Sequence, residues 1–175
     1  MKGFVVKNIL LRKKVINEFR RTCSQCDETC CKKQKAFSIF DSEMLRLPAG
    51  MPLKVEPSWG SSCGVNHFSL ATGCPYSNDV LKGCELDATN RPLDCMCYPL
   101  YPKLKEDNGT LAVEGLIVHK SCGHWEQFSR NRKLAGLLRE VFEEELLSRP
   151  ARSVLFWLRP GQSYWDKSKV KVVNL

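Results

Sequence analysis

Cysteines are the residues in this chain of 175 whose spacing could do chemistry. Eight of the ten form a split cluster, made of Cys23, Cys26, Cys30 and Cys31, then Cys74, Cys84 and Cys95, and finally Cys122. Thiolates bind zinc at about 2.3 Å and also hold iron–sulfur clusters. Short loops such as residues 23 to 26 present two sulfurs to one ion at little entropic cost. The spacing therefore predicts that these eight cysteines bind metal.

The cluster favours more than one metal atom, because the neighbouring side chains of Cys30 and Cys31 tend to diverge and seldom close on a single ion. Sulfur ligands alone do not separate zinc from iron, since both accept four thiolates, and a four-iron, four-sulfur cluster fits the same set. We expect the two other cysteines, Cys63 and Cys97, to be small buried apolar residues. His124 could complete a mixed site with Cys122.

Ten cysteines could instead form disulfides in a secreted domain, or be buried thiols without a ligand. The first residues show no apolar signal-peptide core with a cleavage site, and no stretch approaches the roughly 18 apolar residues of a membrane span. An apolar content of 43% is normal for a soluble domain of this length, which needs few crosslinks. These features favour metal and predict a cytoplasmic protein without a membrane partner.

Positive charge is concentrated around the first cysteine group. Residues 1 to 35 hold ten Lys and Arg residues against three acidic ones, and the whole chain has a formal net charge of +8. Such charge would offset a site that carries about −2 once four thiolates hold a divalent metal. It could also bind nucleic acid or an acidic protein, although no aromatic interleaving or finger-type spacing accompanies it. A targeting segment is the third alternative.

The cysteine motif resembles a known family. Residues 23 to 99 read CSQCDETCC, then GCPY, then Cys84, then RPLDC with Tyr98 and Pro99 behind it. This order is similar to the zinc- or iron-chelating cysteine-cluster family, many members of which also carry a late cysteine like Cys122. Three residues precede the vicinal cysteines where many members have two. That variant resembles the flagellin lysine methylases, much longer proteins whose implied iron–sulfur requirement raises the expectation of iron.

Three functions follow as hypotheses. The first is a metal-binding protein with a structural or metal-handling role, because the sequence has no Gly-rich phosphate loop, nucleophile elbow or paired histidines on a helix. The second is an iron–sulfur enzyme such as a protein lysine methyltransferase, by analogy alone. The third is a nucleic-acid-binding module that uses the basic N-terminal segment. The sequence leaves open whether the protein is an enzyme.

The surrounding pattern predicts one α+β domain over residues 1 to 175, with a motif core at 23 to 99. Apolar spacing predicts a helix at 8 to 21, and residues 36 to 40 and 64 to 70 read as strands. Asp41 is a candidate N-cap of a short helix, and one further strand is expected at 53 to 56. Residues 106 to 109 predict a hairpin turn between strands at 100 to 105 and 110 to 119.

A core-facing helix is expected from about Gly123 to Ser148, followed by a short helix after Pro150, so that residues 123 to 158 are helical. Residues 74 to 102 are rich in turns and are expected to bury little apolar surface, with metal supplying the order. Within them, Arg91 is predicted to support a thiolate or a carboxylate such as Asp87 or Asp94.

Overall fold

The computed structural model describes residues 2–24, 36–44, 46–47, 54–55, 61–69, 74, 76–78, 83–158 and 168–173, which form a small α+β domain. In chain order its elements are α1 (Lys2–Cys23), β1 (Ala36–Phe40), α3 (Asp41–Met44), β2 (Lys54–Val55), the 3-10 turn η1 (Ser61–Cys63), β3 (Val65–Ser69), β4 (Ser77–Asn78), β5 (Gly83–Cys84), α4 (Leu93–Cys97), β6 (Leu100–Asp107), β7 (Thr110–His119), α5 (Trp125–Arg130), α6 (Arg132–Val141), the π-helical turn η2 (Phe142–Leu146), α7 (Ala151–Leu158) and β8 (Val170–Val173).

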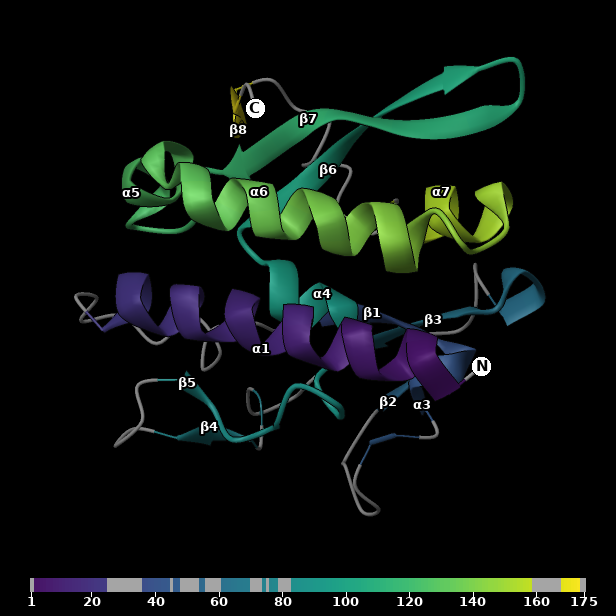
Figure 1. Cartoon of the computed structure of the whole chain (residues 1–175), viewed down its shortest axis with the longest axis horizontal. Helices are drawn as coiled ribbons and strands as arrows, with labels where there is room; N and C mark the ends of the chain where they lie inside the picture. Colours follow the sequence, from purple (N-terminus) through teal and green to yellow (C-terminus); the bar gives the residue numbers. More distant parts are fainter. Residues whose placement is uncertain are drawn as a thin grey trace.

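The larger core lies between α1 and α6, which run antiparallel to each other (Figure 1). Along α1 the buried apolar residues Leu11, Val15, Ile16 and Phe19 recur at helical spacing. The Phe19 ring packs against Phe128 of α5 with ring centroids 5.3 Å apart. The helix expected at residues 8 to 21 is therefore confirmed, and it begins earlier and ends slightly later than predicted.

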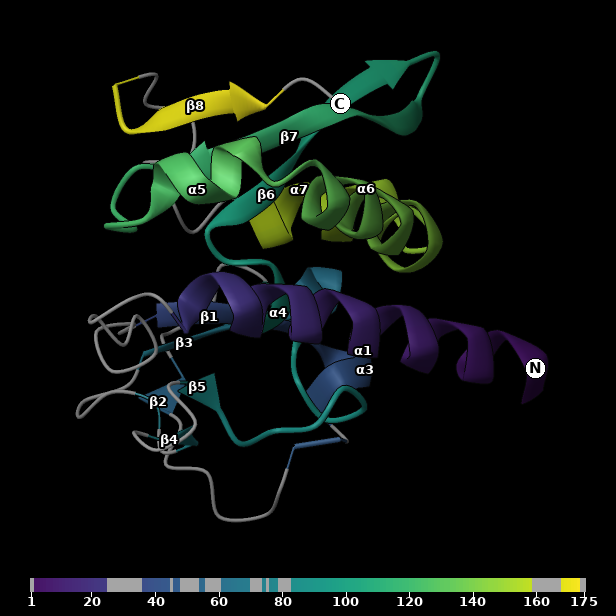
Figure 2. The same cartoon turned by 60° about the vertical axis from the view of Figure 1, so that its left-hand side comes forward.

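An antiparallel sheet in the order β6-β7-β8 covers the other side of α6, as Figure 2 shows. Its long hairpin turns at Asn108 and Gly109, which have φ angles of 50° and 77°. Two successive residues with positive φ are typical of the two-residue hairpin turn that an Asn-Gly pair favours. The sequence prediction of this hairpin is confirmed.

A second antiparallel sheet, in the order β1-β3-β2, carries a smaller core of Phe37, Ile39 and Phe68. Phe37 and Phe68 are register partners in β1 and β3, and their rings stack with centroids 5.8 Å apart. The strands predicted at residues 36 to 40, 53 to 56 and 64 to 70 are confirmed, the first with the same bounds and the other two with bounds that differ by one residue at each end.

The helix predicted from Gly123 to Ser148 is divided into α5, α6 and η2. Asn131 ends α5, and its side chain accepts a hydrogen bond from Leu134 N–H at 3.0 Å, which caps α6. The last part widens into a π-helical turn, closed by the bond from Leu147 N–H to the Phe142 carbonyl. The predicted apolar stripe is confirmed on α6, but Asn131, which lies inside the predicted helix, ends α5 and caps α6 as a new helix.

Residues 83 to 102 bury more apolar surface than the sequence suggested, so that expectation was wrong for this described part of the segment. Leu86, Leu93, Met96 and Leu100 are all buried, and α4 contributes residues to the larger core. The many prolines and turns hide the apolar positions because they break any period. Apolar packing therefore orders part of the segment, independently of any metal.

None of the described helices combines the length and the apolar character needed to cross a membrane.

Candidate metal site and the buried charges that position it

The structure places five of the eight predicted metal ligands. Cys74 and Cys95 pack against the small core, Cys84 lies on β5, Cys23 packs against the edge of the larger core, and Cys122 is buried inside it. The other three, Cys26, Cys30 and Cys31, lie outside the described residues. Among the seven described cysteines no two are joined by a disulfide.

Cys74 and Cys95 come from separate segments and pack against the same small apolar core. Both are half-buried and pack on the same group of rings around Phe37 and Phe68. Cys84 belongs to the same part of the chain, because β5 pairs with β4 a few residues after Cys74. Within the described ranges, no three Cys, His, Asp or Glu side chains lie close enough together to hold a metal ion. The described thiols thus supply the right donor chemistry, and any complete site needs further ligands.

Arg91 forms hydrogen bonds with the backbone around Cys84. It is buried, and its Nη2 donates to the carbonyl oxygens of Cys84 at 2.8 Å and Leu86 at 3.0 Å. Among the described residues it contacts these carbonyls, and not the thiolate or carboxylate that the sequence predicted. A guanidinium can satisfy several carbonyls of a tight loop at once, and here Arg91 fixes the loop that leads from β5 to α4.

Asp94 attaches α4 to the small sheet. The Ser38 N–H donates to its Oδ2 at 2.8 Å, and the Tyr101 hydroxyl donates to its Oδ1 at 3.0 Å. Burial raises the pKa of Asp94 to about 6, although both hydrogen bonds favour the ionised form. Because Asp94 fixes the start of α4 against β1, it also sets the position of the next residue, Cys95.

The two cysteines predicted to be buried apolar residues are buried. Cys97 lies in the larger core, and its thiol donates to the Asp94 carbonyl at 3.5 Å. Burial, with the nearby charges of Asp94 and Cys95, raises the pKa of Cys97 well above its usual range. Cys63 is buried on η1 beside Ser62. Cys97 is therefore held as a neutral thiol.

Three histidines lie in the described ranges. His67 on β3 shares a hydrogen bond of 3.0 Å with the Ser38 hydroxyl, and His119 on β7 is held by Ser121. His124 is half-buried at the start of α5, and it is not part of a metal-binding group among the described residues. Burial lowers the pKa of His119. These contacts tie His67 and His119 into the fold.

A buried ion-pair network joins α1 to the cysteine-bearing segment. Arg12 is 2% exposed and binds Glu145 of η2 with two hydrogen bonds, Nε to Oε1 at 2.6 Å and Nη2 to Oε2 at 2.5 Å. Its Nη1 donates to the carbonyls of Arg91 at 2.8 Å and Ala88 at 3.2 Å. The sequence pattern groups Arg12 with the exposed basic residues, but in the structure Arg12 is buried and its charge is paired with Glu145.

Glu43 of α3 completes this network. Its Oε1 lies 3.6 Å from Arg12 Nη2 and accepts the Leu93 N–H at 2.9 Å, while Oε2 accepts the Phe40 N–H at 3.2 Å. Burial raises the pKa of Glu43, and the charge of Arg12 opposes the rise. The carboxylate therefore connects the start of α3 to the start of α4.

Sequence reasoning missed this network, although one signal was present. Arg12 occupies the position of an apolar residue in the series that continues with Val15, Ile16 and Phe19. Glu145 likewise follows Val141 at helical spacing. One cation and one anion, each within an apolar helix stripe, indicate a buried pair, because isolated charges are rarely buried.

Known proteins offer no independent guide to this site. No protein-family model matches the sequence, and comparisons with curated proteins and with solved structures find no match.

Proposed function

We propose that the chain is a metal-binding protein that holds zinc or iron, including iron in an iron–sulfur cluster, through cysteine thiolates. The proposed ligands are those predicted from the sequence: Cys23, Cys26, Cys30, Cys31, Cys74, Cys84, Cys95 and Cys122. The role is structural or metal-handling, in the cytoplasm. The resemblance to the cysteine-cluster family supports the same proposal.

One observation carries the proposal furthest. Cys74 and Cys95 come from separate segments, yet both lie half-buried on one small apolar cluster. The bonds made by Asp94 and Arg91 fix the backbone beside Cys95 and at Cys84. A metal site needs ligands whose positions are held by a second layer of contacts. Two buried polar side chains, Asp94 and Arg91, therefore hold the backbone of this part of the cysteine motif in place.

Anaerobic purification with elemental analysis and a visible spectrum tests the proposal. We expect stoichiometric metal, with charge-transfer absorption for an iron–sulfur cluster and no colour for zinc. Colourless, zinc-loaded protein would exclude the iron–sulfur enzyme alternative, including a lysine methyltransferase. Protein that carries no metal after anaerobic purification would refute the assignment.

A pair of variants locates the site. We expect Cys95→Ser to lose metal, because it removes a proposed ligand. Cys63→Ser is the control, since it makes the same chemical change at a cysteine that lies on η1, outside the motif. Equal metal loss from both variants would contradict the ligand assignment.

A nucleic-acid partner remains a second candidate because α1 exposes Lys13, Lys14, Arg20 and Arg21. Binding through phosphates would make the affinity for a mixed oligonucleotide fall steeply as salt rises. The variant Lys13→Gln with Lys14→Gln should weaken that affinity and reduce its salt dependence. Absence of binding at low salt would eliminate this candidate.

A further inference from the structure

A cavity of about 500 Å³ lies beside the buried ion-pair network, on the surface formed by α1, α3 and η2. Its lining contains three arginines, Arg12, Arg46 and Arg149, against one acidic residue, Glu145. The Glu145 carboxylate is already bound by two donors of Arg12. The lining therefore carries an excess of positive charge, which the nearby Glu43 carboxylate reduces only in part.

Arg149 is held in place with hydrogen-bonding capacity to spare. Its guanidinium lies over the Phe40 ring, 3.8 Å from the centroid, and its Nη1 donates to the Ser42 hydroxyl at 2.8 Å. Its buried Nε has no hydrogen-bond partner among the described residues. Burial lowers the pKa of Arg149, the charges of Glu43 and Glu145 oppose that fall, and the charges of Arg12 and Arg46 add to it. A bound anion would oppose the fall in the same way as the two carboxylates.

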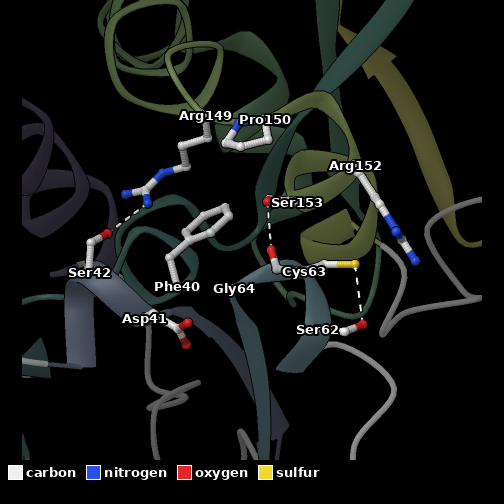
Figure 3. Close-up of a pocket in the computed structure, with 10 residues that line it drawn as sticks. All are labelled: Phe40, Asp41, Ser42, Ser62, Cys63, Gly64, Arg149, Pro150, Arg152 and Ser153. Atoms are coloured by element: carbon white, nitrogen blue, oxygen red, sulfur yellow. Dashed lines mark hydrogen bonds between the residues drawn. The ribbon is translucent and has the colours of Figure 1, made fainter.

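Figure 3 shows the direction in which the Arg149 guanidinium points. The guanidinium points toward Ser42, whereas the Arg152 side chain points away from it on the far side of a second cavity of about 410 Å³. Ser42 and Arg149 line both cavities. The side that also contains Arg46 is therefore where positive charge and donors combine.

Asn8 adds a donor from a further element. It is only 9% exposed and lines the cavity from α1, where its side-chain amide can donate N–H bonds to a bound group. The Thr89 hydroxyl lines the same cavity and can also donate.

We propose that the cavity lined by Asn8, Ser42, Arg46 and Arg149 binds a small phosphate-bearing anion. Planar guanidinium groups pair bidentately with phosphate oxygens. Donors that arrive from three separate elements suit a tetrahedral group with three terminal oxygens better than a carboxylate with two. The volume accommodates more than a single ion, so free phosphate and a small phosphate monoester are both candidate sources. This site goes beyond the proposed metal function and does not depend on it.

Calorimetric titration of the 175-residue protein as purified anaerobically tests the proposal, with inorganic phosphate, glycerol phosphate and acetate as separate probes at constant ionic strength. We expect both phosphates to bind more tightly than acetate. Tighter binding of glycerol phosphate would identify a monoester as the ligand, and equal binding would identify free phosphate. No detectable phosphate binding at about 10 mM, a concentration that would reveal even weak affinity, would overturn the proposal.

Arg46→Gln is the decisive variant, because Arg46 is exposed and the fold does not depend on it. Loss of a charge-assisted bond should weaken phosphate binding about 10-fold or more. Arg130→Gln is the matched control, since it removes the same charge from exposed α5 and should change binding less than about twofold. Asn8→Ala should also weaken binding.

Equal affinities in Arg46→Gln and Arg130→Gln would overturn the site. Metal content should be the same in wild type and Arg46→Gln, so failure of the phosphate site remains distinguishable from failure of the metal proposal.

Discussion

At the scale of single residues, the fold depends on charges placed where apolar side chains would be expected. Arg12, Glu43 and Glu145 come from α1, α3 and η2, and together they fix the loop before α4 through backbone bonds. An apolar trio could pack in the same space, but it could not satisfy the carbonyls of Ala88 and Arg91. The network therefore specifies where the cysteine-bearing loop sits.

Breaking this network should be costly. Arg12→Met leaves two carboxylates buried without their cation, so we expect a loss of about 3–5 kcal/mol in the free energy of unfolding. Chemical denaturation at neutral pH measures it. Arg139→Met is the matched control, because its partner Glu143 is exposed, and it should cost at most about 1 kcal/mol.

The double variant Arg12→Met with Glu145→Met separates pairing from packing. It should recover part of the stability lost in Arg12→Met, since the largest unpaired charge is gone. A double variant as unstable as the sum of both single changes would contradict a buried-pair origin.

Glu18 predicts a pH dependence. A hydrogen bond from Lys133 Nζ, 2.9 Å away, lowers the pKa of this nearly buried carboxyl, with a further bond from Asn131. The native state thus holds its proton less tightly than the unfolded chain. The stabilisation is present above the unfolded pKa of about 4.3 and is lost as the pH falls through the lower native value.

Glu18→Gln should therefore cost about 1 kcal/mol at pH 7 and less at pH 3. Urea midpoints of wild type and variant at both pH values measure the difference, with the exposed Glu126→Gln as control. A difference that stays constant between the two pH values would show that the ion pair is not its origin.

At the scale of elements, the division of the long C-terminal helical segment matters most. The π-helical turn at η2 adds one residue to a turn, which rotates the following side chains relative to a regular helix. Glu145 lies within this turn and reaches Arg12, while Phe142 and Leu146 stay buried. The irregular turn thus combines a buried charge with a continuous apolar face.

Helix α6 contains an avoidable weakness at Gly136. The residue is exposed in the helix, and a Cβ added there would have no neighbour within 4 Å. Gly136→Ala should therefore stabilise the protein by about 1 kcal/mol, measured as a higher thermal midpoint. Gly109→Ala is the contrasting case, because its φ of 77° strains any L side chain and the change should destabilise. A gain from both variants would contradict this account.

At the scale of the whole molecule, two separate apolar cores stabilise the fold. The larger one joins α1, α6 and the β6-β7-β8 sheet, and the smaller one lies on the sheet that carries β1 and β3. Two predicted ligands, Cys74 and Cys95, pack against the smaller core. A third, Cys84, lies on β5, which pairs with β4 just after Cys74. Metal should therefore stabilise that side of the molecule more than the other.

Metal removal tests this division. Chelation should increase amide hydrogen exchange in β4 and β5, whereas α4, β6, β7 and α6 should keep their protection, because their order rests on apolar packing. Exchange monitored by mass spectrometry before and after chelation measures both groups. A uniform loss of protection would mean that the metal supports the whole fold.

The sequence by itself determined the regular elements and the chemistry available. Apolar periods identified α1, the strands of both main sheets and the stripe on α6, and an Asn-Gly pair identified the hairpin, because these signals are local. The cysteine spacing identified the candidate ligands. The roles of individual charged residues could not be predicted in this way, because they depend on contacts between residues that are distant in the sequence.

Only the tertiary structure decided that Arg12 is buried against Glu145 and that Arg91 holds backbone carbonyls instead of a thiolate. It also placed Asn8 beside Arg149, far apart in sequence, at one cavity. A charged residue has the same identity on a surface and in a core, and its environment is set by packing. The physical reason is that burial free energy depends on which segments meet, which no local period encodes.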